Sequence, residues 1–195
     1  MAEIPLEVTD SDRHAAPVTI PSRRSEPGSA YAGLTAAATT MLLAAAIWLS
    51  TQVRPGPMWH DIALFAHLAS LVVGFGAVLV ADYFFVLWRL GRVTFAEAVR
   101  STSWLHLLVW AGLAVLVASG TLLQPNLQSP VTLTKLGLVL ALTLNGVHIA
   151  VLGRRMAALD GPPPLRLLIR GGLATVVSQT CWWGAIVIGF LNANR

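Results

Sequence analysis

The chain has 195 residues, of which 55% are hydrophobic and only 11% are charged, and its mean hydropathy is +0.69. Soluble domains usually carry about 25% charged residues, so this composition excludes an ordinary soluble enzyme and indicates an integral membrane protein. The net charge of +4 does not indicate a nucleic-acid partner, because the arginines lie mainly in short segments beside apolar spans, where they set membrane topology. The lone Cys181 allows neither an intrachain disulfide nor a cysteine-based metal site, and we expect it to pack between helices.

The apolar stretches define the organisation of the chain. Residues 1–29 mix prolines, acids and arginines without an apolar period, and we predict a disordered tail. We expect a loop or short interfacial helix at 91–102 and a basic loop at 153–170. Apart from these two segments and the tail, the chain consists mainly of apolar stretches. Each apolar stretch is long enough to cross a bilayer as a helix. The predicted spans cover about residues 30–53, 61–90, 103–123, 131–152 and 171–190. The sequence therefore predicts an all-α, polytopic membrane protein with five transmembrane helices and a four-helix-bundle core.

The arginines predict the orientation of these spans. Ten of them fall in the tail and in the loops that share its side, whereas only Arg54 and Arg195 fall on the other side. Positive residues accumulate in cytoplasmic loops. We therefore expect the N-terminus in the cytoplasm and the C-terminus outside.

Three polar residues within the spans form a predicted inner layer. His106 and His148, on the third and fourth spans, each lie about 10 Å to the cytoplasmic side of the span midpoint, and Asp82 on the second span falls at a similar depth. Two histidines at matched depth on adjacent antiparallel helices are typical of b-type haem ligation. Asp82 would orient one imidazole by accepting its other N–H. Arg154 and Arg155 at the cytoplasmic edge would pair with the haem propionates.

The fourth span offers room for such a macrocycle. His148 lies within about 20° of Gly137 and Ala141 on the helical wheel. This strip of small residues would let a flat ring approach the helix backbone.

Other interpretations of the inner layer remain open. Asp82 with His106 or His148 would equally serve as a structural pair that fixes helix packing, and the same groups would serve a proton or ion path. Zinc or copper would use the same histidines, although the sequence has no tight His-x3-His spacing. We expect Asn145 and Gln179 to form hydrogen bonds between helices.

A predicted outer layer contains His67 and Lys135, each roughly 10–12 Å to the outer side. His67 would be a second haem ligand, and Lys135 would either snorkel to the surface or lie beside His67 or a ligand carboxylate. Near His67, a stripe formed by Ala66, Ser70 and Gly74 would admit another helix or a flat cofactor close to the backbone.

The last four spans resemble small bacterial helical membrane proteins of the CopD-type copper-resistance and HemJ-type protoporphyrinogen oxidase groups. The resemblance rests on His67, on the segment Lys-Leu-Gly-Leu-Val-Leu that starts at Lys135, and on His148 followed by Arg154 and Arg155. It implies that His67 and Lys135 handle haem or a porphyrin, and that the first span is an addition to a four-helix core. It also implies a location in the bacterial inner membrane.

These observations predict a b-type cytochrome-like redox protein that binds haem b between transmembrane helices and transfers electrons within the bilayer or to a membrane redox partner. The cofactor-binding candidates are His106, His148, His67, Asp82 and Lys135, with His106 and His148 as iron ligands. The alternatives are a non-catalytic accessory subunit of a membrane complex, and a small transporter or metal-handling protein.

Overall fold

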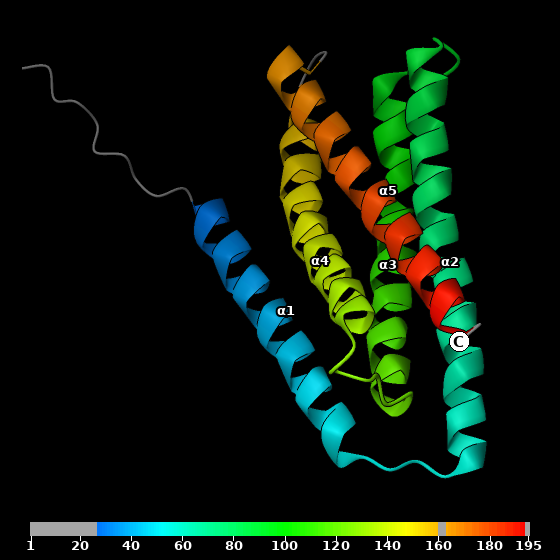
Figure 1. Ribbon diagram of the computed structural model, residues 1–195. Coiled ribbons are helices and arrows are strands. Elements are labelled where there is room, and N and C mark those ends of the chain that lie inside the picture. Colours follow the sequence, from blue (N-terminus) through cyan, green and yellow to red (C-terminus); the bar gives the residue numbers. More distant parts are fainter. Residues whose placement is uncertain (1–26, 160–162, 194–195) are drawn as a thin grey trace, which may run out of the picture.

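Five long helices make up the described part of the protein (Figure 1). The structure is a computed structural model that describes residues 27–159 and 163–193. In chain order the helices are α1 (Pro27–Gln52), α2 (Pro57–Arg89), α3 (Phe95–Leu122), α4 (Pro130–Ala157) and α5 (Leu165–Ala193). All five are long and apolar enough to cross a membrane, which confirms the predicted all-α polytopic fold. The predicted tail lies largely outside the described residues, and α1 already begins at Pro27.

The ends of the helices follow local sequence signals, and α3 starts earlier than predicted. Pro57 and Pro130 stand in the first turns of α2 and α4, where a missing N–H costs nothing. Thr94 and Glu97 form a capping box: the Glu97 N–H donates to Thr94 Oγ1 at 3.2 Å, and the Thr94 N–H donates to Glu97 Oε2 at 2.8 Å. Residues 91–94 form a turn, as predicted, but the prediction of a loop or separate short helix over 95–102 is wrong, because this cap starts α3 at Phe95.

The core lies between α2, α3, α4 and α5, which confirms the predicted four-helix bundle. Its centre is Trp182, which is 2% exposed and lies 5.6 Å from Phe75, measured between ring centroids. Cys181 is buried in the same cluster, as expected. The other buried members of this cluster are Val78, Leu113 and Leu142.

The predicted small-residue stripe on α2 admits a helix. A Cβ added at Gly112 of α3 would lie 2.7 Å from Gly74 Cα and 3.0 Å from the Ser70 carbonyl oxygen. Real side chains do not approach a backbone so closely, so this crossing needs glycine at position 112. The sequence predicts either another helix or a flat cofactor against this stripe, and in the structure helix α3 packs there.

α1 stands apart from the other helices along much of its length (Figure 1). It contacts α3 and α4 and leaves large side chains such as Leu42 and Trp48 exposed. At its end, the Gln124 side-chain amide donates a hydrogen bond to the Val53 carbonyl at 2.6 Å. α1 is thus an addition to the four-helix core and is attached mainly at one end.

Candidate functional site

The imidazole of His67 is held by α3 in a defined orientation. Its Nδ1 lies 3.0 Å from Ser119 Oγ, and that hydroxyl donates its single proton to the Val115 carbonyl at 2.6 Å. Ser119 Oγ therefore accepts a hydrogen bond from His67, so the proton of the neutral imidazole sits on Nδ1.

This tautomer leaves the other ring nitrogen, Nε2, with an unshared electron pair. Among the described residues, His67 Nε2 takes part in no hydrogen bond. A neutral histidine whose Nδ1–H is fixed by a second group is the usual form of a metal-ligating imidazole. This arrangement leaves His67 Nε2 available as an acceptor or a ligand.

Lys135 and His67, the two residues of the predicted outer layer, lie within electrostatic range of each other. Two glycines border the pair: a Cβ added at Gly120 would lie 3.6 Å from His67 Cε1, and a Cβ added at Gly189 would lie 3.9 Å from Lys135 Nζ. We define these two groups together as the His67–Lys135 cluster: His67, Ser119 and Gly120 from α2 and α3, and Lys135 and Gly189 from α4 and α5.

No carboxylate of the described residues neutralises Lys135. The acids in that part of the chain are Asp61, Asp82 and Glu97, and the ion pair found there joins His60 Nδ1 to Asp61 Oδ1 at 3.8 Å. A half-buried ammonium without a counter-ion is costly in an apolar bundle. It is therefore suited to hold the carboxylate of a bound molecule.

Asp82 has a different partner from the one predicted. Its Oδ2 accepts a hydrogen bond of 2.6 Å from Gln179 Nε2, which joins α2 to α5. No hydrogen bond between Asp82 and a histidine occurs within residues 30–159 and 163–192. Gln179 thus forms a hydrogen bond between helices, as expected. This geometry does not place Asp82 where it would orient an imidazole.

The predicted ligands His106 and His148 do not face one another. His106 lies one turn from Trp110 on the same face of α3, and Trp110 packs on Gly146 of α4, where an added Cβ would be 3.2 Å from its ring. His148 is about 200° around α4 from Gly146. Its side chain therefore points away from α3, and the structure does not bring these two imidazoles to one iron position.

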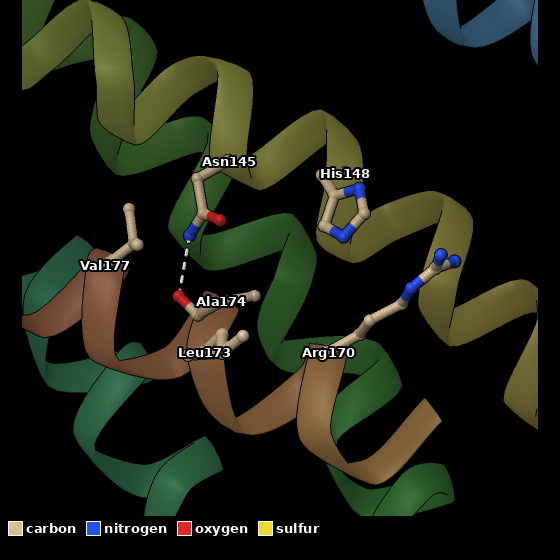
Figure 2. A pocket seen from close by; sticks show the side chains of 6 residues that line it. All are labelled: Asn145, His148, Arg170, Leu173, Ala174 and Val177. Carbon is tan, nitrogen blue, oxygen red and sulfur yellow. Dashed lines mark hydrogen bonds between the residues drawn. The ribbon is translucent and has the colours of Figure 1, made fainter. Parts of the chain in front are cut away.

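His148 instead lines a groove between α4 and α5 (Figure 2). Asn145 Nδ2 donates to the Ala174 carbonyl at 2.8 Å at one end of the groove, which confirms the expected inter-helix bond. Arg170, which was expected in a loop, lies on α5 and extends toward α4 near His148 (Figure 2). The strip of Gly137 and Ala141 that shares the His148 face is exposed, so it faces outward and not into the bundle.

Sequence reasoning missed Ser119, Gly120, Gly189 and Arg170. The glycines and the serine carry no signal of their own, because their role depends on which helix face meets His67 or Lys135. The helical position of Arg170 follows from α5 starting at Leu165, ahead of the predicted 171. Within the described residues, no three histidine, cysteine, aspartate or glutamate side chains come together as a metal site.

Comparison with known proteins adds no assignment to this geometry. No family model, no curated protein and no solved structure matches the chain.

Proposed function

We propose that this chain is an integral membrane, b-type haem-binding redox protein, and that haem is held between α2, α3, α4 and α5 through His67. The observation that carries the proposal is the oriented imidazole of His67, with Nε2 free of hydrogen bonds, within electrostatic range of a half-buried Lys135 that has no carboxylate partner among the described residues. The haem supplies one-electron chemistry when bound.

The His67–Lys135 cluster supplies two of the groups that hold haem in proteins, a histidine nitrogen and a cation. His67 Nε2 would ligate the iron, and Lys135 would pair with a propionate. Gly120 and Gly189 keep side-chain atoms away from both groups. The surrounding apolar helices exclude water, which keeps the pairing of Lys135 with a carboxylate strong. Because His106 and His148 lie elsewhere, the cluster supplies a single histidine, and we expect one protein ligand to the iron.

The resemblance to HemJ-type and CopD-type proteins supports the same two residues. In that group a histidine and a lysine in comparable places are tied to haem and porphyrin handling. It also supports a location in the bacterial inner membrane. For the orientation, we propose a cytoplasmic N-terminus, because the ends of α2 and α4 and the starts of α3 and α5 carry the arginines.

The test is a reduced-minus-oxidised optical spectrum of the purified protein expressed with ample haem. We expect reduced α and Soret bands that His67→Ala abolishes and that Lys135→Gln weakens, while His106→Ala and His148→Ala retain them. Lys135→Arg, which keeps the charge, is expected to restore binding relative to Lys135→Gln. A flat spectrum, or full haem retention in His67→Ala, contradicts the proposal. Loss of haem in His106→Ala or His148→Ala would favour the inner layer.

A second candidate function is a non-catalytic accessory subunit, because the polar groups within the bundle also join helices. His67 bonds to Ser119 of α3, Asp82 to Gln179 of α5, and Asn145 to the backbone of α5. Such contacts stabilise helix association by about 0.6–2 kcal/mol each. An accessory subunit would be colourless and would co-purify with a larger membrane complex under mild solubilisation.

A further inference from the structure

The groove between α4 and α5 carries a combination of side chains that the proposed haem site does not use. Its lining consists of Asn145, His148, Arg170, Leu173, Ala174 and Val177, and it encloses about 440 Å³. One part is polar and basic, and the other is aliphatic. No carboxylate is among these lining residues.

The two basic residues of the groove have no partner within the described chain. Neither the His148 ring nor the Arg170 guanidinium forms a hydrogen bond or ion pair with another residue of 30–159 or 163–192. Both side chains project into the same space from neighbouring helices (Figure 2). An arginine and a histidine that face each other without an acid between them form a site for an anion.

The position of the groove indicates where the anion comes from. Arg170 lies about 13 Å from the midpoint of α5, close to the edge of a hydrocarbon layer whose half-thickness is about 15 Å. Arg170 is exposed, as are Arg154 and Arg166 at the same end of the α4–α5 pair. The groove thus opens from the outer surface of the bundle, with Arg170 just inside the edge of the hydrocarbon layer, where its long side chain reaches the lipid phosphates.

We propose that this groove binds an anionic phospholipid. The phosphate lies between Arg170 and His148, and one acyl chain runs along Leu173, Ala174 and Val177 toward the bilayer centre. Basic pockets between transmembrane helices on the cytoplasmic side are suited to such headgroups. The aliphatic wall is what distinguishes a lipid from free phosphate as the occupant. The site is independent of the haem proposal, because none of its lining residues belongs to the His67–Lys135 cluster.

Two substitutions test whether lipid binding depends on the specific side chains of the groove or only on positive charge at the surface. Arg170→Lys keeps the charge but removes the planar fork that binds two phosphate oxygens. His148→Leu removes a hydrogen-bonding ring at the other side of the groove. Arg92→Lys, at an exposed position just after α2 on the same side of the membrane, is the matched control. All three positions are exposed or line the surface groove, so the fold is expected to remain intact.

The experiment is native mass spectrometry of the full chain in detergent with equal amounts of phosphatidylglycerol and phosphatidylcholine. We expect the wild type and Arg92→Lys to retain phosphatidylglycerol in preference. Arg170→Lys and His148→Leu are each expected to retain about tenfold less, as for loss of a hydrogen bond to a charged group.

Three results would overturn the proposal. The first is equal retention of the two lipids, or retention by Arg170→Lys at the wild-type level. The second is displacement of the lipid by inorganic phosphate alone at millimolar concentration, because the aliphatic wall would then add nothing. The third is loss of haem, and not of phosphatidylglycerol, in His148→Leu, which would make the groove a cofactor site.

Discussion

α1 and the four-helix core are both apolar enough to cross a membrane, yet they are packed very differently. In the most apolar stretch of α1, 6% of the residues are buried inside the protein, against 22–33% in the corresponding stretches of α2 to α5. The hydroxyls of Thr35 and Thr40 in α1 bond to carbonyls of their own helix. Core threonines such as Thr143 do the same, but in the core Asp82 and Asn145 also bond to another helix. Apolar length alone therefore brings a helix into the bilayer, whereas packing needs shape and polar groups that a neighbour matches.

The largest expected difference between the two regions concerns tryptophan. Trp182→Ala removes a side chain that is 2% exposed and is expected to lower the free energy of unfolding by about 3–5 kcal/mol. Trp48→Ala in α1, where the side chain is 65% exposed, is expected to change it by less than about 0.5 kcal/mol. Equilibrium unfolding in dodecyl sulfate, followed by far-ultraviolet circular dichroism, measures both.

A second core variant refines the tryptophan comparison. Trp182 Nε1 is buried and has no hydrogen-bond partner among the described residues. Trp182→Phe keeps an aromatic ring and removes that N–H, so it is expected to cost much less than Trp182→Ala. Equal costs for the two substitutions would show that ring packing against Phe75 contributes little.

Glycine substitutions in the two regions are expected to differ by an intermediate amount in the free energy of unfolding. Gly112→Ala places a Cβ 2.7 Å from Gly74 Cα and is expected to cost about 1–3 kcal/mol, because the α2–α3 backbones must separate. Gly33→Ala in α1 meets no atom within 4 Å and is expected to be neutral or slightly stabilising. The same unfolding measurement applies to both. Equal effects at positions 112 and 33 would contradict the close crossing.

The smallest expected effect concerns polar contacts. A double-mutant cycle with Asp82→Leu and Gln179→Leu is expected to give a coupling energy of about 1 kcal/mol, as for inter-helix hydrogen bonds in membranes. Gln124→Ala, which frees the end of α1 from its bond to the Val53 carbonyl, is expected to cost about 0.5–1.5 kcal/mol. Additive effects of Asp82→Leu and Gln179→Leu would show that the α2–α5 bond does not stabilise the core.

The candidate site shows where sequence reasoning succeeds and where it stops. Depth along a helix follows from counting residues, and the predicted shared level of His67 and Lys135 agrees with the electrostatic interaction between them. The same counting put His106 and His148 at matched depth, but their side chains leave α3 and α4 in different directions. The depth of a residue depends only on its position in its own helix. Whether two side chains face each other depends on how both helices are rotated about their axes, and the contact between Trp110 and Gly146 fixes that rotation for α3 and α4.

The sequence by itself determined that this is a five-span, all-α membrane protein, because apolar length and the cost of unpaired backbone groups in lipid are local properties. It also contained the Thr94–Glu97 capping box, which marks the start of α3. Only the tertiary structure decided which polar groups meet. The contact of His67 with Ser119, the pairing of Asp82 with Gln179, and the exposure of His148 beside Arg170 depend on helix rotation and tilt. Those are set by side-chain packing across the whole bundle, as at the Gly74–Gly112 crossing, and no single span encodes them.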